Sequence, residues 1–307
     1  MKTLKALCLA LLLAPACFAQ NADSLFIRKI YDEALVKGHS YENLRYLCKN
    51  IGPRLSGSTG AAKAVDWTRK LMEGYGFDTV YLQEVMVPHW ERGEKETAYI
   101  LDKQKKISVP VAALGGSIAT PAKGITAQVV EVKTFEELRA LGENAIKGKI
   151  VFFNRAFDPT PVSTFISYRG ASNQRGQGAV EAAKLGAVGV IVRSMTHAID
   201  DNPHTGGMRY AEGVEKIPAA AISTRGANLL SEKLKQDPNM KFYLKQNCRQ
   251  NPDVLSYNVI GEIRGSQKPE EIITVGGHLD SWDLAEGAHD DGTGCIQAIE
   301  ALRIYKA

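Results

Sequence analysis

The sequence predicts an α/β protein built in two parts. Short β-branched runs alternate with segments whose apolar residues recur at helical spacing. From about residue 95 the composition changes to Gly, Ala and Val with short apolar strands, and it changes back near residue 250. A β-branched run, Ile272–Val275, stops at two glycines and is followed by acidic residues and a histidine. Because α/β sheets place their sites at the carboxyl ends of strands, this run predicts a buried strand that leads into a functional site.

Composition narrows the class of protein. The 307 residues are 44% hydrophobic and 23% charged, which is typical of a globular protein with room for two domains. The formal net charge of +4 is small, and part of it lies in the first residues of the chain. It therefore gives no reason to expect a nucleic acid or an anionic membrane as a partner.

Residues 1–19 have the pattern of a cleavable signal peptide. Lys2 and Lys5 precede an apolar core that is too short to span a bilayer, and small residues lead to Ala19. We expect cleavage there and a secreted or periplasmic protein without a membrane span. Lipid attachment at Cys17 is the weaker alternative. After cleavage three cysteines remain, Cys48, Cys248 and Cys295, which allow at most one disulfide.

The first part is predicted to be mostly helical. Residues 23–37 and 61–73 have helical apolar spacing, and Ser40 is a candidate cap for a helix between them. The segment 52–58 contains Gly-Pro and a Ser/Gly cluster, which predicts a tight loop. Thr79–Val87 predicts a strand, and His89 is expected in a solvated loop.

The middle part predicts alternating strands and helices. Strands are expected at residues 127–132, 149–153, 186–192 and 217–222, and helices at 135–141 and 179–185. The glycine-rich stretch from Gly170 to Gly178 lacks the end of a phosphate loop, so we interpret it as a flexible loop. The polar residues Asp200, Asp201, His204 and Thr205 are interpreted as a solvated loop, with a metal site or a substrate contact from His204 as alternatives.

The last part carries the candidate site. A strand is expected over 257–263, and a helix after Gly294. In an extended chain His278 and Asp280 point the same way, so the carboxylate can orient the imidazole for a metal. Asp290 lies in a glycine-rich turn and could share its two oxygens between two metals. We therefore assign His278 as a ligand, Asp280 as its orienting group and Asp290 as a bridging ligand; Asp291 could instead cap the following helix.

The phrase Gly-Gly-His-Leu-Asp-Ser-Trp-Asp at 276–283, followed by Gly-Ala-His-Asp-Asp-Gly-Thr-Gly at 287–294, resembles the di-zinc exopeptidases related to bacterial leucyl aminopeptidase. The resemblance implies a mixed-sheet zinc-exopeptidase sandwich and two Zn²⁺ ions that activate a water. It implies His278 as a zinc ligand, Asp290 as the bridge and Asp280 as a catalytic support. Small peptides are the implied substrates, and a homodimer is left open.

A second phrase, Gly-Lys-Ile-Val at 148–151 with Ala-Ala-Lys-Leu-Gly-Ala at 182–187, resembles the protease-associated domain found inserted in many exopeptidases. The expected organisation is peptidase residues 20–94, an insert over 95–250, and peptidase residues 251–307. In the family the other ligands and a catalytic Glu lie further along the chain. We therefore expect a sandwich truncated at its C-terminal side, and an inactive fragment.

Three alternatives remain open at this point. An aminopeptidase, a carboxypeptidase and a dipeptidase share the same motif. A related zinc enzyme closes a ring on an amino-terminal Gln, although the insert argues against it. The chain could also be a non-catalytic binding module with half a metal site, in which case it would hold no zinc tightly.

Overall fold

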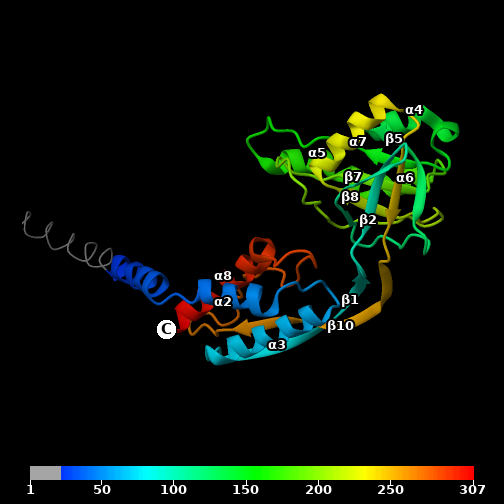
Figure 1. The fold of residues 1–307 in the computed structure, drawn as a ribbon. Helices are drawn as coiled ribbons and strands as arrows, with labels where there is room; N and C mark the ends of the chain where they lie inside the picture. Colours follow the sequence, from blue (N-terminus) through cyan, green and yellow to red (C-terminus); the bar gives the residue numbers. More distant parts are fainter. Residues whose placement is uncertain (1–21) are drawn as a thin grey trace, which may run out of the picture. The chain divides into compact units, whose positions relative to one another are not determined.

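The computed structural model describes residues 22–307. The expected signal peptide and Cys17 lie outside the described residues. The chain divides into two compact units: the first runs up to Pro88 and resumes at Asp253, and the second is His89–Pro252 (Figure 1). The sequence placed the corresponding boundaries at 94/95 and 250/251. Each unit has its own core.

The first unit combines helices with a two-stranded ribbon. A helix over residues 22–36 comes first. The remaining elements are α2 (Ser40–Tyr46), the short π-helix η1 (Leu47–Ile51), α3 (Thr59–Gly74), β1 (Thr79–Glu91), β10 (Arg249–Glu262), the short π-helix η2 (Ala288–Gly292) and α8 (Thr293–Lys306). Strands β1 and β10 pair with each other, and both continue into the second unit. The expected cap at Ser40 is wrong, because Ser40 lies inside α2 and His39 holds the cap position.

Helix α3 begins at a residue whose side chain caps it. The Ser58 side chain accepts a hydrogen bond from Ala61 N at 3.2 Å, which satisfies a free amide of the first turn. The helix lies along the β1–β10 ribbon, and its Met72 packs with Phe77. A Cβ on Gly261 of β10 would lie only 2.7 Å from the Phe77 ring, so this contact requires glycine. Ile296 and Ile299 of α8 complete the same core.

The predicted buried strand at Ile272–Val275 is wrong. The segment has no regular secondary structure, and Ile272 and Ile273 are 85% and 91% exposed. A β-branched run becomes a strand only where a neighbour takes up its backbone N–H and C=O groups. Among residues 22–307 no strand pairs with this run.

The second unit is built on an eight-stranded mixed sheet. Its strands are β2 (Thr97–Asp102), β3 (Lys105–Ser108), β4 (Val111–Ala113), β5 (Ile125–Val132), β6 (Ile150–Phe153), β7 (Gly189–Arg193), β8 (Ala219–Ile222) and β9 (Lys241–Lys245). Its helices are α4 (Phe135–Ile146), α5 (Thr164–Gly176), α6 (Gly178–Ala183) and α7 (Thr224–Gln236). The sheet order is β3-β2-β9-β5-β6-β7-β8-β4, with β5 to β8 parallel. The mixed α/β fold class is confirmed.

Strand β6 separates two cores. All four of its residues are buried, as expected for a central parallel strand. Ile150 and Phe152 pack on the side of α7, whereas Val151 and Phe153 pack on the side of α4 and α6. The continuous apolar run in the sequence is therefore explained by helices on both faces of the sheet.

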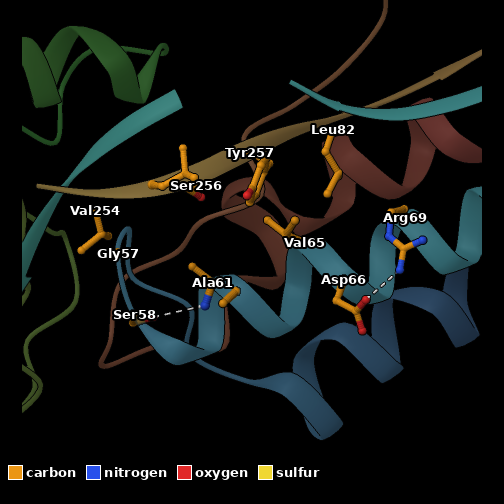
Figure 2. Close-up of a pocket in the computed structure, with 12 residues that line it drawn as sticks. Gly57, Ser58, Ala61, Val65, Asp66, Arg69, Leu82, Val254, Ser256 and Tyr257 are labelled. Atoms are coloured by element: carbon orange, nitrogen blue, oxygen red, sulfur yellow. Dashed lines mark hydrogen bonds and ion pairs between the residues drawn. The ribbon is translucent and has the colours of Figure 1, made fainter. Parts of the chain in front are cut away.

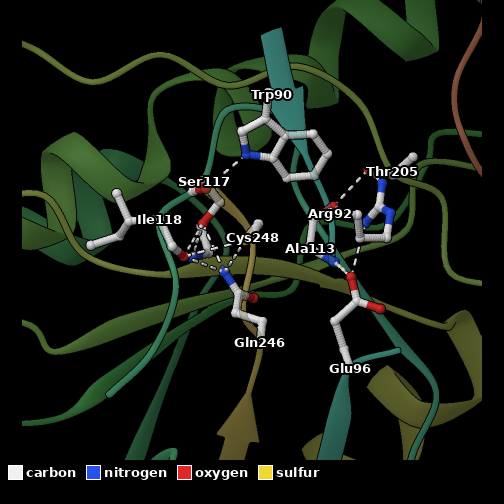
Figure 3. Close-up of polar contacts among 10 residues, drawn as sticks. Trp90, Arg92, Glu96, Ala113, Ser117, Ile118, Thr205, Gln246 and Cys248 are labelled. Atoms are coloured by element: carbon white, nitrogen blue, oxygen red, sulfur yellow. Dashed lines mark hydrogen bonds and ion pairs between the residues drawn. The ribbon is translucent and has the colours of Figure 1, made fainter. Parts of the chain in front are cut away.

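A buried polar cluster lies where β1 enters the second unit (Figure 3). Trp90 Nε1 donates to the Ser117 carbonyl at 2.9 Å, and Arg92 pairs with Glu96 at 2.9 Å. The expectation of a solvated loop at His89 is wrong, because His89 lies within β1 and its Nε2 is 3.2 Å from a Glu91 oxygen.

The glycine-rich stretch from Gly170 to Gly178 is not a flexible loop, because residues up to Gly176 belong to α5. Ala171 and Gln174 are buried on this helix, and the Gln174 side chain accepts from Arg155 N at 3.3 Å. Tertiary packing of these two residues therefore outweighs the low helix propensity of glycine.

The polar residues near position 200 have structural partners. Asp201 pairs with Arg225 at 3.2 Å, and Thr205 Oγ1 donates to the Ala113 carbonyl at 2.8 Å. His204 N donates to Ser194 Oγ at 2.8 Å. These contacts hold the loop against the rest of the second unit.

Two further features concern the described residues as a whole. No helix within residues 22–307 is long and apolar enough to cross a membrane. Cys48, Cys248 and Cys295 are buried and free, so the part of the chain that the structure describes contains no disulfide.

Candidate metal centre

The candidate centre is built on a segment without regular secondary structure that leads from β10 to α8. Its first contact fixes the backbone: His278 N donates to Asp291 Oδ2 at 3.2 Å. Asp291 therefore bonds the His278 backbone and does not cap α8, whose cap position is held by Gly292. A Cβ on Gly277 would lie 2.3 Å from that carboxylate oxygen, so the close approach depends on glycine there.

The structure brings the three predicted site residues together. His278 Nδ1 lies 3.1 Å from both the main-chain oxygen and Oδ1 of Asp280. His278 Nε2 lies 2.8 Å from Oδ1 of Asp290. One ring nitrogen therefore faces the predicted orienting group and the other faces the predicted bridging ligand.

Two carboxylates set the electrostatics of this imidazole. Partial burial lowers the pKa of His278, but the hydrogen bond with Asp290 and the negative charge of Asp280 together outweigh it, and the net effect raises the pKa. The three side chains are open to solvent, with 56% of His278, 48% of Asp280 and 80% of Asp290 exposed. A solvent-borne ion can reach this site.

The side chains of His278 and Asp290 can supply part of the coordination sphere of a zinc ion. A neutral imidazole nitrogen and a carboxylate oxygen are both ordinary zinc donors. With Nδ1 bonded to Asp280, Nε2 must carry a proton to make its contact with Asp290, and this proton is the one that a metal displaces on binding. Within residues 22–307 no group of three or more His, Cys, Asp or Glu side chains could hold a metal, so the set supplies part of a coordination sphere.

Sequence reasoning missed Arg54. It interpreted the segment 52–58 as a tight loop only. The Arg54 side chain is fully buried, and its guanidinium donates to the carbonyls of Glu286 and Gly287, within the segment that joins His278 to Asp290. The available signal was a lone charged residue inside a loop that otherwise consists of Gly, Pro, Leu and Ser.

A separate cavity of about 460 Å³ lies between α3 and the ribbon of the first unit (Figure 2). Val65 and Leu82 give it apolar walls, and Asp66 and Arg69 lie at one end. His278, Asp280 and Asp290 do not line this cavity. It therefore carries no part of the candidate centre.

The site residues fall inside a segment with a family match. Residues 258–307 match the model of peptidase family M28. The chain is 38% identical over 291 residues to the carboxypeptidase Q of Bos taurus, a match that covers 95% of this chain and 59% of that protein. The resemblance stated from the sequence is confirmed, and the chain spans about three-fifths of the length of this relative.

Solved structures agree on the fold. The crystal structure of a peptidase M28 precursor from Shewanella amazonensis matches with a TM-score of 0.87 and 38% identity, covering 93% of this chain and 64% of that one. A zinc aminopeptidase from Bacillus subtilis matches with a TM-score of 0.60 and 22% identity, covering 88% of this chain and 57% of that one. At that identity the second likeness concerns the fold alone.

Proposed function

We propose that this chain carries part of the metal centre of an M28-like zinc exopeptidase that hydrolyses dipeptides or terminal residues of small peptides. The observation that carries the proposal is the His278 ring, whose Nε2 faces Asp290 at 2.8 Å while Nδ1 is held by Asp280 at 3.1 Å. Similarity to carboxypeptidase Q over 95% of the chain supports it.

Each of the three residues has a role that its contacts support. His278 Nε2 is the proposed zinc ligand, because the contact with Asp280 keeps a proton on Nδ1, so that Nε2 is the nitrogen that exchanges its proton for a metal. Asp290 is the proposed bridge between two zinc ions, because it adjoins Nε2 with one oxygen and most of its side chain is exposed. Two bound zinc ions would lower the pKa of a water molecule and polarise the scissile carbonyl.

His278 and Asp290 are too few donors for two zinc ions. A structural or catalytic zinc has about four coordination positions, of which the protein fills at least three. Among the described residues no group of three or more His, Cys, Asp or Glu side chains is arranged to hold a metal ion. We therefore expect the 307-residue chain by itself to bind zinc weakly and to hydrolyse no peptide, with further ligands and a general base supplied from elsewhere in a longer protein.

The remaining parts of the proposal rest on the sequence. The second unit is proposed to be a protease-associated insert, and the export signal at residues 1–19 is proposed to send the protein out of the cytoplasm. Both carboxypeptidase and aminopeptidase names occur among the relatives, so the choice of terminus stays open between them. A homodimer is compatible with the proposal.

Metal binding tests the centre directly. We would titrate the 307-residue chain with Zn²⁺ and follow the ring signals of its histidines by NMR. We expect His278 to shift first, and His278→Ala and Asp290→Asn to abolish the effect. His289→Ala is the matched control, because His289 is the exposed neighbour of Asp290. Equal loss in the His289 variant, or no shift of His278 at any zinc concentration, contradicts the proposed centre.

Peptide hydrolysis tests the function. The protein encoded by the complete reading frame would be assayed with zinc on dipeptides, and on peptides blocked at either terminus. We expect hydrolysis that EDTA removes and zinc restores. Tolerance of a blocked amino terminus identifies a carboxypeptidase, tolerance of a blocked carboxyl terminus an aminopeptidase, and zinc binding without any hydrolysis identifies the non-catalytic binding module instead.

A further inference from the structure

Arg54 is a buried cation whose partners are backbone carbonyls. Its side chain is completely shielded from solvent, although arginine is among the residues least often buried. Among residues 22–307 no carboxylate lies within ion-pair distance of it. Burial lowers the pKa of the Arg54 guanidinium, and this outweighs the negative charge of Asp280, which raises the pKa. A charge buried without a counter-charge is costly, so its carbonyl contacts need explanation.

Those contacts clamp both ends of one segment. Nε donates to the carbonyl of Leu279 at 2.5 Å, immediately after His278. Nη1 donates to the carbonyl of Glu286 at 2.6 Å, and Nη2 to that of Gly287 at 2.7 Å, just before the turn that holds Asp290. The planar guanidinium fork therefore spans the segment 279–287 from one end to the other.

The backbone of Arg54 strengthens the clamp. Arg54 N donates to Ser281 Oγ at 3.3 Å, and Ser281 N donates to the Arg54 carbonyl at 3.2 Å. A fourth carbonyl, of Gly52, accepts from Nη1 at 3.3 Å and ties the guanidinium to its own loop. The loop at 52–58 and the segment 279–287 are thereby joined into one rigid piece.

The segment is shaped around the guanidinium. Gly287 has φ of +61°, and a Cβ there would lie 2.3 Å from the Cβ of Ser281 and 2.9 Å from Arg54 Nη2. The Gly287 carbonyl that accepts from Nη2 also accepts from Gly292 N at 3.0 Å. This second bond closes the η2 turn around Asp290, so the position of Gly287 is transmitted to that carboxylate.

We infer that Arg54 is a positioning residue that sets the separation between His278 Nε2 and Asp290 Oδ1. It does so by fixing Leu279 on one side and Gly287 on the other. The consequence for zinc rests on the proposed function, whereas the geometry of the two side chains does not. Arg54 touches neither metal donor, and it acts only through the backbone that carries them.

The experiment compares Arg54→Lys with a matched control, Arg303→Lys. Lysine keeps the positive charge, but it lacks the planar fork with which arginine donates to three carbonyls at once. Arg303 is also a buried arginine of the first unit, but its partners are Glu300 and Glu33. Thermal unfolding would be measured for both variants. A general loss of stability, which both should share, can then be told apart from a specific change at the candidate metal centre.

The first readout needs no metal. Hydrogen exchange would be followed over the 279–292 backbone, with the ¹⁵N shifts of the His278 ring. We expect Arg54→Lys to lose protection there and to shift the His278 nitrogens, and Arg303→Lys to do neither at a similar melting temperature. Unchanged shifts and protection in a folded Arg54→Lys chain overturn the inference.

The second readout is zinc affinity, followed through the same His278 signals. We expect about a tenfold loss or more in Arg54→Lys, as is common when a group that orients a ligand is removed, and no loss in Arg303→Lys. If the wild-type chain binds no zinc, the proposed metal centre is contradicted and the metal-free readout alone decides the role of Arg54.

Ser281→Ala provides the same test if Arg54→Lys does not fold. It removes only the hydroxyl that accepts from Arg54 N. We expect a smaller change of the same kind, with increased exchange over 279–292 and a shift of the His278 ring. A stable Ser281→Ala chain with wild-type exchange and ring shifts argues against the clamp.

Discussion

Glu300 and Arg303 form a two-point ion pair within α8. Arg303 Nε lies 3.0 Å from Oε2 of Glu300, and Nη2 lies 2.8 Å from Oε1. The same arginine reaches Glu33 at 2.8 Å, and Glu300 accepts from His39 N at 3.1 Å. The pair therefore ties the first helix and the start of α2 to the helix that follows the candidate centre.

Glu300→Gln should lower the free energy of unfolding by about 1.5–3 kcal/mol at neutral pH, since a hydrogen-bonded charge is removed from a buried network. Burial raises the pKa of Glu300, but the Arg303 guanidinium and the His39 amide outweigh it, and the net effect lowers the pKa. The stabilisation is therefore present above the pKa of the unfolded state and is lost as the pH falls through the folded value.

Urea unfolding of the Glu300→Gln chain and the wild type at several pH values checks this. The difference between them should shrink as the solution is acidified. Glu271→Gln is the control, because Glu271 is 64% exposed and pairs with the exposed Lys268, and it should change stability by less than about 0.5 kcal/mol. A difference that grows in acid would show that Glu300 is not an ionised partner of Arg303.

Asp280→Asn should weaken zinc binding without abolishing it. The variant keeps the main-chain oxygen that contacts His278 Nδ1, but loses the carboxylate that favours the required tautomer. We expect a loss of affinity of about 10- to 100-fold, against complete loss in His278→Ala. Titration followed by NMR measures both, and wild-type affinity in Asp280→Asn would contradict the orienting role.

Glu96→Gln should destabilise the second unit. One oxygen of this carboxylate accepts from Arg92 at 2.9 Å and from Ala113 N at 2.7 Å, and its side chain is only 4% exposed (Figure 3). Removing one partner of a buried pair typically costs about 3–5 kcal/mol. Thermal unfolding measures the loss, with exposed Glu94→Gln as control, and equal melting temperatures would refute the prediction.

Ile273→Lys should reduce self-association. The exposed run around Ile273 has high β-propensity, and no strand among residues 22–307 pairs with it, which favours edge-to-edge contacts between molecules. Light scattering against concentration should show less association, at an unchanged melting temperature. Val162→Lys adds the same charge at another fully exposed position, and an equal benefit there would assign the effect to net charge instead.

Cys248 and Cys295 should be slow to alkylate in the folded chain. Burial raises the pKa of each thiol to about 11, so little reactive thiolate exists at pH 8. Labelling with iodoacetamide followed by peptide mass spectrometry should find both unmodified in native buffer and modified in denaturant. Rapid native labelling of Cys295 would show that the start of α8 opens readily.

Local sequence signals predicted the elements that depend on local chemistry. The apolar run of β6 and the pairing of His278 with Asp280 both follow from residues close together in the chain. The approach of Asp290 to His278 was predicted by a motif whose glycines allow the chain to turn back.

Three of the failures depend on partners that are distant in the chain. Ile272–Val275 has strand composition, but pairing decides whether a strand forms. Helix α5, which contains Gly170, is held by the packing of Ala171 and Gln174 against the rest of the second unit. Arg54 is informative only through carbonyls more than two hundred positions away, and no spacing rule reveals a main-chain acceptor.

The second unit begins and ends at one place. Near its ends, Gln250 donates to the His89 carbonyl at 3.3 Å, and Arg249 donates to Glu91 at 2.7 Å. A stretch that departs and returns through adjoining strands can be excised or transplanted as a cassette, because a short hairpin suffices to rejoin the cut ribbon. Gene rearrangements could therefore add or delete the whole sheet while leaving the path of the surrounding polypeptide untouched.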